Sequence, residues 1–375
     1  MNYCSKCLCP DTRPGIIIHN DQICSACKGH EIKENEIDWD ARESKFYEII
    51  KNNRGSNSNY DCIVPASGGK DSWYQIIKCK ELGLTPLAVT WKTPGRTLLG
   101  QQNLDAMVKN LNVDHIDYSI SQSVEKRFMK LAFEKKGDPG LPFHMAIYSL
   151  PYRLAVQMNI PLIIWGENSQ LEFGGNKDEQ LATSIDNEWM KKHGCMQGTD
   201  ITDWTENGLS LKDLAGYRLP NEEEFSNCKV KVQRLFLGSF FKWNSFDNAE
   251  IAKKYGFYYD KNSRKTGYWE FADLDCNFIS LHHFPMWHKF GTNRVLDNLS
   301  VQIRYGLISK EEAISKAQEI GLPVPHEDIK LFCHFVGENE EWWWNTIEKF
   351  RNKNIWVKHE NSWKINDFII PSWKW

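Results

Sequence analysis

The run with the clearest chemical meaning is Ser67-Gly68-Gly69-Lys70-Asp71-Ser72, between a strand-like segment and a helical pattern. Glycines let a backbone approach an anion closely, and a helix N-terminus offers it unpaired N–H groups. Lys70 and the two serines add charge and donors. The Asp71 carboxylate suits a phosphate only if a cation lies between them, and Mg²⁺ is the natural choice. The run therefore predicts a nucleotide phosphate site. The plainer alternative is a glycine-rich turn with a serine cap.

A second pattern is the pair Cys4-x-x-Cys7 and Cys24-x-x-Cys27. Four thiolates from two such knuckles form a closed tetrahedral zinc site, and a segment this short needs the metal to fold. Cys9 is a spare thiol whose spacing from Cys7 is wrong for a knuckle. A redox pair is the alternative, but it would need only one Cys-x-x-Cys.

Two further segments carry polar groups that suit a nucleotide or substrate. Gly166, Glu167 and Asn168 follow a buried strand, and ligands of open α/β sheets lie outside the carboxyl ends of the strands. On the alternative interpretation these residues only cap the next helix. Lys289 and Arg294 lie in a C-terminal block rich in basic and aromatic residues, which suits the binding of a phosphate or an acidic sugar. The alternative is a packed helical domain with an exposed polar face.

Alternating strand-like and helix-like segments from Tyr60 onward predict a parallel sheet with helices on both faces. We therefore expect an α/β fold with a Rossmann-like sheet, preceded by a zinc ribbon and followed by a mainly helical region. The predicted ranges are 1–35 for the four-cysteine module, 36–59 for a helix and linker (GSNSN at 55–59), 60–245 for the nucleotide domain and 246–375 for a substrate or partner region. We leave 176–234 without assigned elements, and LFLGSFFKW is a candidate for a further strand.

The composition is that of an ordinary folded protein: 375 residues, 25% charged and 41% hydrophobic, with a formal net charge of −3. That charge argues against nucleic acid as the main partner, because phosphate neutralisation needs a basic surface. An apolar run of about 18 residues, the mark of a membrane helix, is absent, and so is a secretory signal. We expect a soluble cytoplasmic protein without nucleic-acid or membrane partners.

The SGGKDS run resembles the PP-loop of ATP pyrophosphatases, which implies cleavage of ATP to AMP and pyrophosphate. Together with the four-cysteine cluster, the WGEN strand end and the HKFGTNR…IRYGLIS-x-EEAI block, it makes nearly the whole chain resemble the N-acetyl sugar amidotransferase family. One departure is Leu274-Asp275-Cys276, where the family pattern has Leu-Asp-Asp, so the role of Asp275 stays open.

The resemblance implies an ATP-dependent enzyme that converts an acetamido group of a bacterial sugar to acetamidino, with ATP, Mg²⁺ and Zn²⁺ bound. Such sugars belong to nonulosonic acid and lipopolysaccharide pathways. ATP would bind over Ser67–Ser72 with Mg²⁺ at Asp71, Glu167 and Asn168 would line the nucleotide or acceptor site, and Lys289 and Arg294 would face acidic groups. Self-association is left open.

Conversion of an acetamido to an acetamidino group needs ammonia. The run HGCMQG around Cys195 lacks the glycines of a glutaminase nucleophile elbow, so we expect a separate glutaminase subunit. Two alternatives remain: a tRNA thiolation enzyme, which would need a sulfur-handling cysteine pair, and a non-catalytic zinc-ribbon scaffold. The tryptophan-rich C-terminus is a docked segment, a sugar-stacking surface or a partner interface.

Overall fold

The computed structural model describes residues 1–53, 58–194, 196–260, 266–360 and 362–375. Cys195 and most of the predicted linker at 55–59 lie outside these ranges. Within them, no helix is long and apolar enough to cross a membrane.

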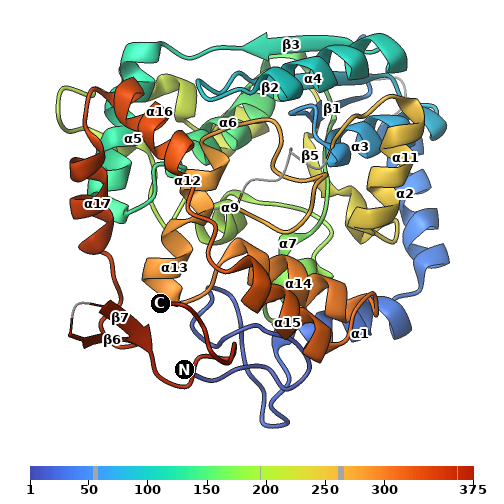
Figure 1. The fold of residues 1–375 in the computed structure, drawn as a ribbon. Coiled ribbons are helices and arrows are strands. Elements are labelled where there is room, and N and C mark those ends of the chain that lie inside the picture. Colours follow the sequence, from blue (N-terminus) through green and yellow to red (C-terminus); the bar gives the residue numbers. More distant parts are fainter. Residues whose placement is uncertain (54–57, 195, 261–265, 361) are drawn as a thin grey trace.

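A five-stranded parallel sheet forms the centre of the described chain (Figure 1), in the order β3-β2-β1-β4-β5. Its strands are β1 (Cys62–Pro65), β2 (Pro86–Trp91), β3 (Asp114–Tyr118), β4 (Leu162–Trp165) and β5 (Gln233–Phe236). The strand order reverses between β1 and β4, and ligands of such sheets bind at this switch point. The predicted α/β parallel sheet is confirmed.

Helices cover both faces of the sheet. On one face Cys62 and Val64 of β1 share a core with α2 (Trp39–Asn53), α3 (Lys70–Glu81), α4 (Leu98–Leu111) and α11 (Ser245–Tyr255). Ile63 points to the opposite core, made with α5 (Gln122–Lys136) and α6 (Leu141–Met158). Because successive side chains of a strand point to opposite faces, the apolar run of β1 serves both cores.

The segment left unassigned at 176–234 contains only short helices and β5. These are α8 (Lys177–Leu181), α9 (Asn187–His193), the 3₁₀ turns Ile201–Trp204 and Asp213–Tyr217, and α10 (Glu222–Ser226). The strand predicted at LFLGSFFKW is shorter and lies earlier, at β5 (Gln233–Phe236), because the chain turns into a 3₁₀ helix (Leu237–Ser239) directly after Phe236.

The described C-terminal region is mainly helical, as expected. It contains α12 (Ile279–His283), α13 (Pro285–Phe290), α14 (Arg294–Arg304), α15 (Lys310–Ile320), α16 (His326–Val336), α17 (Glu340–Glu348) and the hairpin β6 (Trp356–His359) and β7 (Ser362–Ile365). At the start of α15, Ser309 and Glu312 form a capping box.

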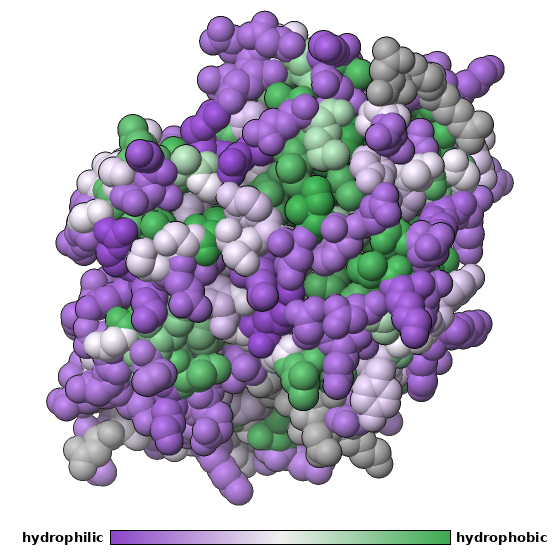
Figure 2. Space-filling view, turned by 90° about the horizontal axis from the view of Figure 1, so that it is seen from above, coloured by the Kyte–Doolittle hydropathy of each residue, from purple (hydrophilic) through white to green (hydrophobic). Residues whose placement is uncertain are grey.

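The cysteine module and the C-terminal region lie against each other at the bottom of Figure 1, where α1 (Ser25–Asn35) and α7 (Ser169–Phe173) approach α14 and α15. The two ends of the chain also meet, since the Tyr3 ring lies 6.4 Å from that of Phe368. Seen from above, hydrophobic surface lies mostly in recesses between hydrophilic side chains (Figure 2).

Candidate active site

The predicted phosphate loop lies at the carboxyl end of β1, where the chain turns into α3. Gly68 has a φ of +88°, and a Cβ there would stand 2.8 Å from the backbone nitrogen of Leu104, so only glycine fits. Two hydrogen bonds within the loop hold its conformation. The Ser67 N–H donates to Ser72 Oγ at 3.0 Å, and the Gly69 N–H donates to Ser67 Oγ at 3.3 Å.

Lys70 and Asp71 occupy the first turn of α3, whose N-cap residue makes no side-chain capping hydrogen bond. Lys70 is 6% exposed, and its Nζ donates to Asp71 Oδ2 at 2.5 Å. The second oxygen, Asp71 Oδ1, is buried and has no hydrogen-bond partner among the described residues. A buried unpaired carboxylate oxygen costs free energy unless a cation or donor reaches it. The donor set therefore fits a magnesium–phosphate group at the helix N-terminus.

Glu167 lies beside this pair at the carboxyl end of β4. Burial and the neighbouring Asp71 carboxylate raise the pKa of Glu167 to about 7, against the opposing charge of Lys70. Its neighbour Gly166 is held by the backbone, with its carbonyl accepting the Gly238 N–H at 3.0 Å. The structure thus places Glu167 within electrostatic reach of the phosphate loop.

Asn168 has a different environment. It is 1% exposed and caps α7 by accepting the Gln170 N–H at 3.0 Å. Its amide donates to the carbonyl oxygens of Glu179, Gln180 and Ala182. Since the chain itself uses these polar atoms, Asn168 has the capping role that the sequence offered as its alternative.

Two carboxylates reach the loop from the segment before α12. Asp273 pairs with Arg294, with Oδ2 3.1 Å from Nε. Burial raises the pKa of Asp273, but Arg294, His283 and Lys70 outweigh that effect, and the pKa falls to about 2. Burial raises the pKa of Asp275, and a hydrogen bond from Ser67 opposes the rise. The ion pair with Asp273 therefore connects Arg294 to the surroundings of the loop.

The start of α4 positions this acidic segment. The Thr97 N–H donates to the Asp275 carbonyl at 3.1 Å, and a Cβ on Gly100 would stand 2.5 Å from the Asp275 Cα. The motif analysis missed Asp273 and left Asp275 open. The signal available was the pair of carboxylates two residues apart in Asp273-Leu274-Asp275; the backbone there is bent, since Asp273 has a φ of +61°.

The loop faces a cavity of about 280 Å³, here called the loop cavity. Ser67, Ser72, Asp273 and Asp275 contribute its polar lining, and side chains of β2 and α6 form an apolar wall. Cys276 also lines it, and burial raises the pKa of this thiol to about 12 against a hydrogen bond with Thr93. Cys276 is therefore protonated at neutral pH and is a poor sulfur nucleophile.

Lys289 lies apart from the loop cavity, which it does not line. Its Nζ donates to the Lys136 carbonyl at 2.9 Å. Burial lowers the pKa of Lys289, and the Asp138 carboxylate opposes this. Asp138 in turn lies 3.0 Å from His282 Nδ1. Lys289 and Arg294, which the sequence placed in one block, thus have different partners and lie in different surroundings.

The four predicted zinc ligands converge. The Sγ atoms of Cys4, Cys7, Cys24 and Cys27 all lie within 4.8 Å of one another and are buried. Two of the separations are 3.6 and 3.8 Å, close to the edge of about 3.8 Å that Zn–S bonds of about 2.3 Å give a tetrahedron. Cys9 is buried beside them but is not one of this group. The cluster fits zinc.

Helix α14 connects the cysteine module to the loop cavity. Arg294 at its start holds Asp273, and Asp297 in its first turn pairs with Arg13 of the module at 2.8 Å. Arg304 at its end donates to the Glu172 carbonyl at 2.9 Å. One helix therefore contacts the module, the acidic segment and α7.

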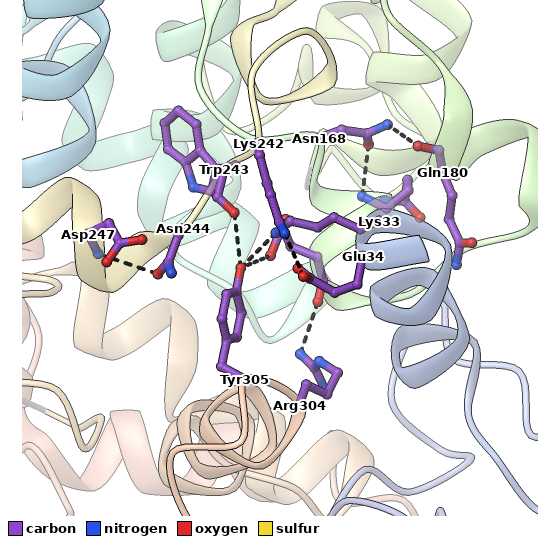
Figure 3. A network of polar contacts seen from close by, with 12 residues as sticks. Lys33, Glu34, Asn168, Gln180, Lys242, Trp243, Asn244, Asp247, Arg304 and Tyr305 are labelled. Atoms are coloured by element: carbon purple, nitrogen blue, oxygen red, sulfur yellow. Dashed lines mark hydrogen bonds and ion pairs between the residues drawn. The ribbon is translucent and has the colours of Figure 1, made fainter. Parts of the chain in front are cut away.

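The network at the end of α14 is shown in Figure 3. Lys33 of α1 donates to both Glu172 and the Tyr305 hydroxyl, and that hydroxyl donates to the Trp243 carbonyl at 3.1 Å. Lys33 is 1% exposed, and its ammonium group forms an ion pair with the Glu172 carboxylate. The module is thus fixed to the sheet domain by buried polar contacts.

These features define the chain as an α/β protein with a glycine-rich loop at the switch point of its sheet. Residues 252–369 match the family model of the WbpG-like LPS biosynthesis protein C-terminal domain. This match covers α12 to β7 and includes the acidic segment. The search of curated proteins gave no match.

Among solved structures, the chain is similar to the NH3-dependent NAD synthetase of Campylobacter jejuni, with 17% identity over 58% of this chain and 93% of that one and a TM-score of 0.30. The NMN synthetase of Francisella tularensis gives 16% identity, coverage of 51% and 91%, and a TM-score of 0.27. The NAD+ synthetase of Burkholderia pseudomallei gives 10% identity over 62% of this chain and 94% of that one, with a TM-score of 0.28.

Proposed function

We propose that the protein is an ATP-dependent amidotransferase that converts an acetamido group of a bacterial surface sugar to acetamidino. One observation carries the proposal: the phosphate loop opens into the same cavity as Asp273 and Asp275, which belong to the region matching a lipopolysaccharide biosynthesis family. A nucleotide held by the loop would therefore lie beside residues of the region that matches this family.

In the proposed reaction the acetamido oxygen attacks the α-phosphorus of ATP, an O–P bond forms and pyrophosphate leaves. Ammonia then adds to the activated carbon, and the C–O bond breaks. The oxygen departs with AMP, and the amidine remains. A separate glutaminase subunit would supply the ammonia.

The chain's own residues would act mainly by positioning and charge neutralisation. The loop N–H groups, Lys70 and the two serines would hold the phosphates, and Arg294 would be released from Asp273 to face developing charge. Mg²⁺ at Asp71 Oδ1 would neutralise phosphate oxygens. Glu167, with a pKa of about 7, is suited to take the proton that ammonia loses at neutral pH.

The thiolation alternative is disfavoured by the state of the thiols. The loop cavity contains one cysteine, Cys276, whose pKa is about 12. Cys62 and Cys79 lie together but are fully buried in the core. A persulfide carrier needs an accessible thiolate.

The test is incubation of the zinc-loaded protein with ATP, Mg²⁺, an ammonium salt and a 2,4-diacetamido sugar. We expect AMP and a sugar product lighter by the difference between an oxygen atom and an NH group, measured by mass spectrometry. Asp71→Ala should abolish turnover without changing the zinc content, whereas Asp105→Asn, an exposed carboxylate on α4, should be active. Release of ADP, or full activity of Asp71→Ala, would refute the proposal.

A further inference from the structure

The tryptophans near the C-terminus divide into two groups. Seven of the sixteen lie between Trp342 and Trp375. Trp343 is fully buried and stacks on Phe133 with ring centroids 4.2 Å apart, and Trp342 meets the same ring edge-on. Packing accounts for these two. The other five, together with Trp287, surround an open space.

This space, here called the tryptophan cavity, measures about 330 Å³. Its aromatic lining includes Trp287, Trp344, Trp356, Trp363, Trp373 and Trp375. The tryptophan and loop cavities share no lining residue. The lining elements α13, α17, β6 and β7 lie at the left of Figure 1, away from β1 and α3.

The wall also contains one histidine ring, His288, whose Nδ1 has no hydrogen-bond partner among the described residues. His288 is 5% exposed. Its backbone is fixed, because its carbonyl accepts the Trp356 indole N–H at 3.0 Å. Burial and the Arg351 charge lower the pKa of His288 to about 4, so the ring is neutral and offers one donor and one acceptor.

The charged lining is basic. Arg351 is held by Glu348 (Nε–Oε1 2.9 Å) and lies over the Trp356 and Trp363 rings, while Lys374 is exposed at the rim. Among the described lining residues none is acidic. A cationic ligand of the kind that aromatic cages hold would meet like charge here. An anionic group is favoured instead.

We propose that the tryptophan cavity binds a pyranose ring that carries a carboxylate. The apolar C–H face of such a ring packs on indole faces, its hydroxyls suit the His288 imidazole, and its carboxylate suits Arg351 and Lys374. The ligand comes either from a free sugar or from the end of a glycan, which share this chemistry. The site is separate from the loop cavity and does not depend on the reaction proposed there.

The experiment is titration calorimetry on the zinc-loaded full chain with methyl β-D-glucuronide, alongside the neutral methyl β-D-glucoside and sodium acetate. We expect a dissociation constant of about 1 mM or tighter for the glucuronide and binding at least about tenfold weaker for the other two. Trp375→Ala and Lys374→Gln should each weaken glucuronide binding about tenfold or more. Lys330→Gln, an exposed lysine on α16 that does not line the cavity, is the matched control.

Asp71→Ala separates this proposal from the proposed catalysis, since it should lose turnover but retain glucuronide binding. An oligosaccharide ending in glucuronate then distinguishes a glycan from a free sugar by its higher affinity. No glucuronide binding, equal binding of acetate, or binding unaffected by Trp375→Ala and Lys374→Gln would each overturn the proposal. A dimer that Trp375→Ala dissociates would assign the cavity to a second copy of the chain instead.

Discussion

Replacing Glu125 by glutamine tests how the wall of the loop cavity is held. Glu125 is 3% exposed on α5 and accepts the indole N–H of Trp91 at 3.1 Å. Trp91 and Phe143, which stack with centroids 6.0 Å apart, both line the loop cavity. Burial raises the pKa of Glu125 from 4.5 to about 8, against the hydrogen bond from Trp91, so the carboxyl is protonated at neutral pH.

The two pKa values of Glu125, in the folded and the unfolded protein, determine how the free energy of unfolding changes with pH. Below about pH 4.5 both the folded and the unfolded protein carry a protonated Glu125, and its contribution to stability is fully present. Between pH 4.5 and 8 the unfolded state ionises while the folded state stays protonated, so stability falls as pH rises. At about 1.4 kcal/mol per pKa unit the full difference is about 5 kcal/mol, and local relaxation lowers this to roughly 2–4 kcal/mol.

Glutamine has the same shape, keeps the acceptor for Trp91 and cannot ionise. We expect Glu125→Gln to match the parent protein near pH 5 and to be more stable by roughly 2–4 kcal/mol near pH 8.5. The assay is urea unfolding at several pH values, with zinc present throughout. Glu134→Gln is the matched control, because Glu134 lies on the same helix and also accepts an indole N–H, but is half-buried. A stability difference that does not change with pH would refute the reasoning.

Three further predictions concern the loop, the metal and the core. Gly68→Ala should destabilise the protein by about 1–3 kcal/mol and lower ATP turnover, whereas Gly306→Ala, with φ +68° and no neighbour within 4 Å, should cost only about 1 kcal/mol and leave turnover unchanged. Cys24→Ser should lose the zinc that Cys9→Ser retains, as measured by elemental analysis; equal zinc in both variants would place Cys9 among the ligands. Trp343→Ala should lower the free energy of unfolding by about 3–5 kcal/mol in urea titration, and a loss under 1 kcal/mol would contradict its packing role.

Much of the site was predictable because its signals are local. A glycine-rich run between a buried strand and a helix places Ser67–Ser72 at a strand end, whatever the rest of the chain does. The two Cys-x-x-Cys knuckles likewise carry their ligand spacing within a few residues. The same locality explains why Asn168 stayed ambiguous: a strand-end asparagine has the same sequence whether it faces a ligand or caps α7.

The sequence by itself determined the alternating α/β order, the glycine-rich turn between β1 and α3, and the cysteine cluster. Only the tertiary structure decided that Asp273 and Asp275 line one cavity with Ser67 and Ser72. It also decided that Arg294 pairs with Asp273, whereas Lys289 donates to the Lys136 carbonyl away from that cavity. It also decided that the surplus tryptophans enclose a second cavity. The physical reason is that contacts between distant segments depend on how helices and loops pack together, and the short-range patterns of one sequence do not encode that pairing.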